Sequence, residues 1–128
     1  MIEINNLTNF AVDKKFLTGV AKIVLKGENR ERENISIAFV SSDEIKKLNQ
    51  KYRKKNKSTD VLSFGRTLDF KSDIAEIVIC PEVVKKNNEE LAKILIHGIL
   101  HILGYEHEKS EKQAKEMEKK QEKYLSII

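Results

Sequence analysis

The chain has 128 residues, the length of one domain, and its 40% hydrophobic content is enough for an ordinary core, which excludes disorder as the default state. Its 24 Lys and Arg residues exceed its 20 Asp and Glu residues by four, so a surface dense in both signs of charge has a mild basic surplus. No run approaches the roughly 18 apolar residues of a membrane-spanning helix, the N-terminus lacks a signal pattern, and the single Cys80 cannot form an internal disulfide. We therefore expect a cytoplasmic protein with no membrane partner.

The first two thirds of the chain alternate between strand and helix patterns. Runs rich in β-branched and apolar residues predict strands over 1–6, 35–40, 61–64 and 74–79. We expect the first strand at a sheet edge and the second covered on both faces. Apolar residues at helical spacing predict a helix over 12–26 whose stripe begins at Phe16. A second helix begins at Ser41 and Ser42 and is expected to end before a solvated loop over 53–57.

The last third of the chain predicts helices only. A short helical segment over 82–87 is followed by a long one over 89–103, by Gly104 as a left-handed stop, and by a charged helix over 110–125. The apolar stripe of this last helix contains Ala114, Met117, Gln121 and Leu125. The order of elements predicts one α+β domain over 1–128, with a small mixed sheet flanked by helices.

All three histidines of the chain lie within the segment His97-Gly-Ile-Leu-His101-Ile-Leu-Gly-Tyr-Glu-His107. Residues four apart lie on one face of a helix, so His97 and His101 can direct their rings to a common point. A turn at Gly104 can bring His107 to the same point. Three imidazoles with a fourth position left to water are typical of a catalytic zinc site. The spacing therefore predicts one Zn²⁺ per chain, bound to a helix like that of the zinc peptidases.

The two helical histidines could instead be ordinary core residues that bind no metal. A single histidine in an apolar helix is usually a hydrogen-bonded core residue. Here two imidazoles lie on a helix that is apolar over 91–103 apart from Lys93, and few polar residues nearby in sequence can bond them. The pairing favours metal binding. Imidazole also suits nickel and iron, so the choice between zinc and another first-row metal stays open.

The histidine spacing is also that of zinc peptidases with the signature H-E-x-x-H-x-x-G-x-x-H. In those enzymes the Glu after the first His polarises the attacking water, whereas this chain has Gly98 at that place. A peptidase of this kind would need another general base, for which Glu106 and Glu76 are the candidates. The same metal geometry suits hydrolysis of a phosphodiester, in which the ion activates water and polarises a phosphoryl oxygen.

A phosphodiester substrate requires positive charge beside the metal, and five of the seven residues over 51–57 are basic. Arg53 can bind a phosphate in a bidentate manner, and Lys54, Lys55 and Lys57 can add charge. Tyr52 offers a surface on which a base can stack. Charge runs are more often solvated loops without a specific partner, so this run alone is weak support for RNA binding.

Four segments of the chain form a specific set. Residues 48–53 match L-N-x-x-Y-R. The histidine segment resembles the pattern H-G-x-L-H-L-x-G-Y-D-H, residues 58–64 resemble P-T-D-V-L-S-F, and residues 76–82 resemble D-I-V-I-x-P-E. In this order the segments resemble the YbeY family of bacterial endoribonucleases. Four places depart from the family pattern, and none of them is an expected metal ligand: Ser58, Gly65, Ala75-Glu76 and Glu106.

The resemblance implies a mixed sheet flanked by helices, zinc as the metal, and His97, His101 and His107 as its ligands. It places the family's arginine on Arg53, so that Arg53, His97 and His101 are the expected catalytic residues. The implied activity is single-strand-specific cleavage of RNA, in maturation of the 3′ end of 16S ribosomal RNA and in ribosome quality control. Ribosomal RNA and the ribosome are therefore the expected partners.

Two alternatives of other kinds stay open. The first is a metallopeptidase-like hydrolase whose general base is displaced from its usual position. The second is a non-catalytic ribosome- or RNA-binding module in which the metal only holds the turn at Gly104.

Overall fold

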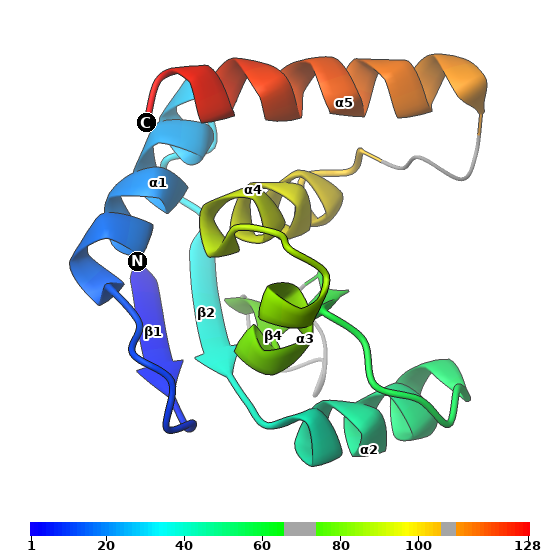
Figure 1. The fold of residues 1–128 in the computed structure, drawn as a ribbon. Coiled ribbons are helices and arrows are strands. Elements are labelled where there is room, and N and C mark those ends of the chain that lie inside the picture. Colours follow the sequence, from blue (N-terminus) through cyan, green and yellow to red (C-terminus); the bar gives the residue numbers. More distant parts are fainter. Residues whose placement is uncertain (66–73, 106–109) are drawn as a thin grey trace.

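The computed structural model describes residues 1–65, 74–105 and 110–128, and within them the elements follow the predicted order (Figure 1). The strands are β1 Ile2–Asn6, β2 Asn34–Phe39, β3 Val61–Phe64 and β4 Ile74–Ile79. The helices are α1 Lys14–Gly27, α2 Ser42–Arg53, α3 Pro81–Lys86, α4 Leu91–Ile102 and α5 Glu111–Ser126. The prediction of a small α+β domain is confirmed.

The four strands form one mixed sheet in the order β1-β2-β4-β3. Strands β1, β2 and β4 are mutually parallel, and β3 is antiparallel to β4. The prediction that β1 lies at an edge is confirmed. Because β3 is the other outer strand of the described sheet, its outward carbonyl groups need donors from elsewhere in the chain. One such donor comes from Arg53, which binds the main-chain oxygen of Ser63 in β3.

Helices cover both faces of the sheet (Figure 1). One face packs against α1, α4 and α5, and its core includes Ile37 of β2 and Ile77 of β4. The other face carries a smaller core in which Leu62 and Phe64 of β3 pack with Ile45 of α2. Alternate residues of a strand point to opposite faces, so neighbours along β3 and β4 serve different cores. The expectation that β2 is covered on both faces holds only in part, because its residues alternate between buried on the face of the main core and half-buried on the other face.

Side-chain caps fix where three helices begin. The side chains of Asp13, Ser41 and Ser110 accept hydrogen bonds from main-chain N–H groups in the first turns of α1, α2 and α5. Such caps satisfy donors that the helix leaves without partners. The expected start of the second helix at Ser41 and Ser42 is therefore confirmed.

Two details differ from the sequence prediction. Helix α2 includes Arg53, so the loop begins one residue later than expected, at Lys54, whose left-handed conformation ends the helix. Phe16 is not buried with the stripe of α1: it lies in the first turn and is 48% exposed, whereas Leu17 beside it is 2% exposed. The core-facing side of α1 thus begins one residue later than the apolar pattern indicates.

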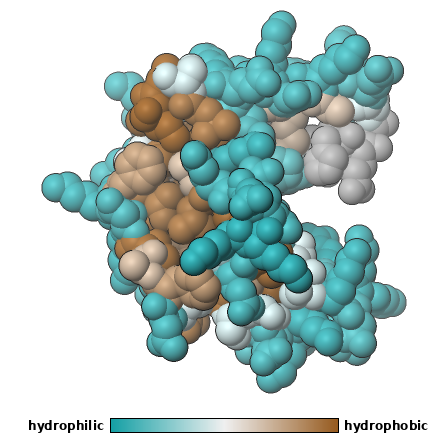
Figure 2. All heavy atoms as spheres, in the orientation of Figure 1, coloured by the Kyte–Doolittle hydropathy of each residue, from teal (hydrophilic) through white to brown (hydrophobic). Residues whose placement is uncertain are grey.

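The ends of α4 and the outer surface of the helices agree with the sequence. Gly104 has a φ of +105°, a conformation that glycine adopts without strain, and it follows the end of α4 as predicted. Hydrophilic side chains dominate the surface over α5 and α2 (Figure 2). Across the described parts of the chain, we find no helix with the length and apolar character that crossing a membrane requires.

Candidate functional site

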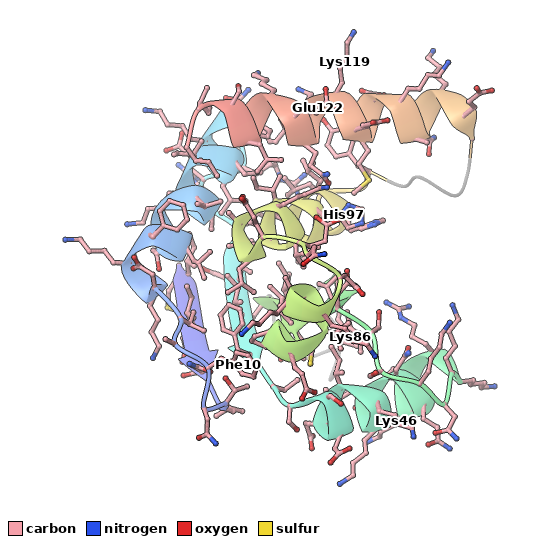
Figure 3. All side chains as sticks on the ribbon, viewed as in Figure 1. Phe10, Lys46, Lys86, His97, Lys119 and Glu122 are labelled. Carbon is pink, nitrogen blue, oxygen red and sulfur yellow. The ribbon has the colours of Figure 1, made fainter. Side chains whose placement is uncertain are left out.

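His97 and His101 lie one turn apart on α4 and face each other. Their Nε2 atoms are 3.1 Å apart, and their ring centroids are 4.6 Å apart with the planes at 80°. Both side chains are half-buried, while the helix between them packs Ile99 and Leu100 into the core without exposure. Figure 3 shows His97 on the side of α4 away from α1. We refer to His97 and His101 as the histidine pair.

The histidine pair has the spacing that a shared zinc ion requires. Two nitrogens each 2.0–2.1 Å from a tetrahedral ion are about 3.3 Å apart, close to the 3.1 Å between these Nε2 atoms. Neutral imidazole is a favoured ligand of zinc. The donor atoms that the structure describes at this place therefore fit a zinc ion.

Gly98 lets α4 lie close to the sheet. A Cβ atom at this position would lie 3.2 Å from Cγ2 of Ile77 and 3.2 Å from Oγ of Ser63, closer than most real Cβ contacts. The Ser63 hydroxyl donates to the main-chain oxygen of Gly98 over 3.3 Å. The residue after His97 thus faces the sheet, where a glutamate side chain has no room.

Arg53 lies beside the same part of β3. One guanidinium N–H group donates to the main-chain oxygen of Ser63 over 2.8 Å, and the guanidinium carbon lies 5.3 Å from the ring centre of Phe64. Tyr52 packs edge-on against the same ring. Ser63 therefore connects the two parts of the candidate site, because its carbonyl group binds Arg53 and its hydroxyl group binds the main chain next to His97.

Comparison with known proteins assigns the chain to a family. Residues 3–128 match the family described as Endoribonuclease YbeY. This chain belongs to the YbeY endoribonuclease family. The resemblance seen in the sequence motifs is thereby confirmed.

Individual relatives agree with the family match. The chain is 42% identical over 104 residues to Endoribonuclease YbeY of Thermotoga maritima, an alignment that covers 74% of this chain and 67% of the relative. It is 35% identical over 125 residues to Endoribonuclease YbeY of Thermosipho melanesiensis, covering 91% of this chain and 88% of the relative. The solution structure of TM1509 from Thermotoga maritima superposes with a TM-score of 0.63 at 34% identity and covers 98% of this chain and 87% of that one.

The basic loop that follows α2 in this YbeY family member is exposed. Lys54, Lys55 and Lys57 all lie at the surface next to the end of α2. The loop is nevertheless tied to the helix, because the side chain of Asn49, only 3% exposed, donates to the main-chain oxygen of Lys57 over 2.9 Å. The predicted phosphate-binding lysines are thus exposed and follow Arg53 closely in the chain.

Two predicted residues, His107 and Glu106, lie outside the described residues. Among residues 1–65, 74–105 and 110–128, no cluster of three or more His, Cys, Asp or Glu side chains could hold a metal. The structure thus brings together two of the three expected ligands and leaves the third as a prediction. The other candidate base, Glu76, pairs in register with Phe64, and strand alternation places it on the sheet face opposite to that of Ile77 and α4.

Gln121 was not predicted from the sequence to belong to the site. Its side-chain oxygen lies 3.0 Å from Nδ1 of His97. The one sequence signal was the presence of an amide on the apolar stripe of α5, between Met117 and Leu125. A polar residue at such a position needs a partner inside the protein.

A second group of polar contacts that was not predicted from the sequence centres on the carboxylate of Glu28. Tyr105 donates to Oε1 of Glu28 over 2.6 Å, Tyr124 donates to Oε2, and Nζ of Lys120 lies 3.3 Å from Oε2. We refer to Glu28, Tyr105, Lys120 and Tyr124 as the Glu28 cluster. Burial alone would raise the pKa of the Glu28 carboxyl, but these hydrogen bonds outweigh it and lower the pKa. The cluster joins the end of α1 to α5 and to the chain after Gly104.

Cys80 is a buried residue of the smaller core. Its side chain is fully buried in the smaller core, and burial raises the pKa of its thiol. A buried thiol whose pKa is raised is a poor nucleophile. The residue therefore packs as a small apolar side chain.

Proposed function

We propose that the chain is a zinc-dependent, single-strand-specific endoribonuclease that acts in ribosomal RNA maturation. The observation that carries the proposal is the histidine pair, whose Nε2 atoms face each other at the separation that one ion requires. Membership of the YbeY endoribonuclease family supplies RNA as the substrate class. The maturation of the 16S ribosomal RNA 3′ end and ribosome quality control belong to the same proposal, as does action in the cytoplasm.

The ligands in this proposal are His97, His101 and His107. A divalent ion held there would supply Lewis-acid activation of water and of a phosphoryl oxygen. Helix α4 holds the two imidazoles in place, because its other face is packed in the main core. Rigid support of this kind keeps reacting groups in position.

In this proposal Arg53 stabilises the negative charge that develops on the phosphoryl oxygens during cleavage. A guanidinium group has five N–H donors, so a bond to the carbonyl group of Ser63 leaves it able to bind a phosphate as well. That bond and the ring of Phe64 restrict where the side chain lies. Lys54, Lys55 and Lys57 then attract the neighbouring phosphates of a single strand.

The peptidase alternative is disfavoured by the position of Gly98. The base of the peptidase signature would have to replace Gly98, and that position faces Ile77 and Ser63 of the sheet. Glu76 lies on the opposite face of the sheet. Within the described residues, neither position offers a carboxylate on the α4 side of the sheet.

A cleavage assay with single-stranded RNA tests the proposal. The purified protein should cleave the RNA, lose activity on chelation while it stays folded, and leave double-stranded RNA intact. Metal analysis should find zinc, and His101→Ala should lose both the metal and cleavage.

Arg53→Ala should reduce cleavage by about 100- to 1,000-fold and keep the metal, because it removes transition-state stabilisation alone. Arg32→Ala, a change of another exposed arginine, serves as the matched control.

Each alternative has its own signature in this assay. Hydrolysis of a peptide substrate, with RNA left intact, would identify a metallopeptidase. Unfolding on chelation without any cleavage of RNA would identify a structural metal. Full cleavage by Arg53→Ala would remove Arg53 from the site.

A further inference from the structure

Gln121 reaches the histidine pair from a different helix. Its Oε1 atom lies 3.0 Å from Nδ1 of His97, and the two residues are 24 positions apart in the chain. Gln121 is half-buried, one turn from Met117 and three residues before Tyr124, both of which are buried. Packing of these neighbours fixes the side of α5 that faces α4. Lys119, by contrast, points away from α4 (Figure 3).

The chemistry of this contact selects one form of His97. With the amide oxygen toward Nδ1, as the structure has it, the contact is a hydrogen bond only if the neutral ring carries its proton on Nδ1, because an amide oxygen only accepts. The lone pair is then on Nε2, which is the atom that faces Nε2 of His101 at 3.1 Å. The same bond restricts rotation of the ring. Protein groups that hydrogen-bond the second nitrogen of a metal-binding histidine commonly fix its tautomer and orientation.

We propose that Gln121 is a positioning residue that holds His97 in the Nδ1–H form and directs its Nε2 lone pair at a bound divalent cation. The inference rests on the proposed metal site and adds to it a residue from α5. Gln121 supplies a neutral acceptor. A carboxylate at the same place would be a stronger acceptor and would make the imidazole a better ligand.

The first experiment measures the tautomer directly in metal-free protein. Nitrogen NMR of the histidine side chains should show His97 with its proton on Nδ1 in the wild type. In Gln121→Leu, which has no acceptor, His97 should shift toward the form with its proton on Nε2. A wild-type ring protonated on Nε2 would overturn the inference, because the amide would then present its NH₂ group to Nδ1.

The second experiment measures zinc affinity by competition with a chromophoric chelator. Gln121→Leu should weaken binding by about 10- to 100-fold, the usual effect of losing such a partner. Gln121→Glu should bind zinc as tightly as the wild type or more tightly. A merely structural role would make both changes harmful, so the opposite responses separate positioning from packing. Gln113→Ala, at an exposed position in the first turn of α5, should leave affinity unchanged.

The outcomes distinguish this inference from the proposed function. Wild-type zinc affinity in Gln121→Leu would overturn the inference alone. A wild-type protein without zinc affinity would overturn the proposed function and this inference together. Thermal unfolding of each metal-free variant verifies that the compared proteins are folded.

Discussion

Helix α5 contacts two polar clusters whose hydrogen-bonding patterns differ. In the Glu28 cluster, Tyr105, Tyr124 and Lys120 present donors to both oxygens of one carboxylate. In the histidine pair, two nitrogens of the same kind face each other. The Glu28 contacts join fixed donors to fixed acceptors, whereas the two Nε2 atoms can either share one proton in a hydrogen bond or both bind a cation. The first arrangement suits a cluster that stabilises the fold, and the second suits one that binds an ion.

The two clusters are adjacent along α5. Lys120 and Tyr124 contact Glu28, and Gln121 between them contacts His97. Most of the outer surface of α5 is exposed and charged, so few apolar side chains attach it to the domain. We infer that the Glu28 cluster holds α5 in the place from which Gln121 can reach the histidine pair.

Removal of the central carboxylate should have the largest effect on folding. Glu28→Ala leaves two tyrosine hydroxyls and one ammonium group without their acceptor, and should lower the free energy of unfolding by about 3 kcal/mol. Urea unfolding of the metal-free protein measures this loss. Glu118→Ala, at an exposed position on α5, should change stability by no more than about 0.5 kcal/mol. An equal loss in both variants would show that the cluster contributes nothing specific.

A methyl group on Gly98 should have an intermediate effect. Gly98→Ala places a Cβ 3.2 Å from side-chain atoms of Ile77 and Ser63, so these side chains or α4 must shift by a few tenths of an ångström. Overpacking of this kind costs about 1 to 3 kcal/mol. Gly19→Ala is the matched control, because no atom lies near its added Cβ. Unchanged stability in Gly98→Ala would mean that the approach of α4 to the sheet is looser than the structure shows.

The order of strands and helices could be predicted from the sequence because it depends on local patterns. Apolar periodicity, the serine caps and Gly104 all act within a few residues of the boundary they set. The exposed position of Phe16 could not be predicted this way, since periodicity does not say which turn of a helix first meets the core. The histidine pair was predictable for the same local reason as the helices: its residues are four apart.

The contacts that support the site were not predictable because they join distant parts of the chain. Tyr105 and Tyr124 reach Glu28 across 77 and 96 residues, and Gln121 reaches His97 across 24. The bond from Arg53 to Ser63 depends on β3 lying at the edge of the sheet. Such contacts follow from strand order and helix packing, which local patterns do not specify.

Replacement of the histidine pair should have a smaller effect on folding than either change above. His97→Leu combined with His101→Leu removes two half-buried polar rings from an apolar helix, so stability of the metal-free protein should stay within about 1 kcal/mol or increase. Added zinc should raise the unfolding temperature of the wild type and leave that of the double variant unchanged. A large loss of stability in the metal-free double variant would assign the pair a structural role.

The Glu28 cluster should also make stability depend on pH, in opposite senses at the two ends of the pH scale. The lowered pKa of Glu28 means that its contribution is present above the ordinary value of 4.5 and is lost as the pH falls through the pKa of the folded state. The hydrogen bond to Glu28, aided by burial, raises the pKa of Tyr105 from 10 to about 12. The unfolded chain therefore loses this proton first, and the contribution of Tyr105 is complete below pH 10 and is lost as the pH rises toward 12.

Unfolding by urea at a series of pH values tests both senses in one pair of variants. Tyr105→Phe should reduce the loss of stability above pH 10, because the titrating hydroxyl is gone, and should leave most of the acid dependence in place through Tyr124 and Lys120. Glu28→Gln should reduce both dependences. It removes the carboxyl group whose pKa the donors lower, and with it the acceptor that raises the pKa of Tyr105. If Glu28→Gln changed only the acid side, the raised pKa of Tyr105 would have to come from burial, and the two ends of the cluster would act independently.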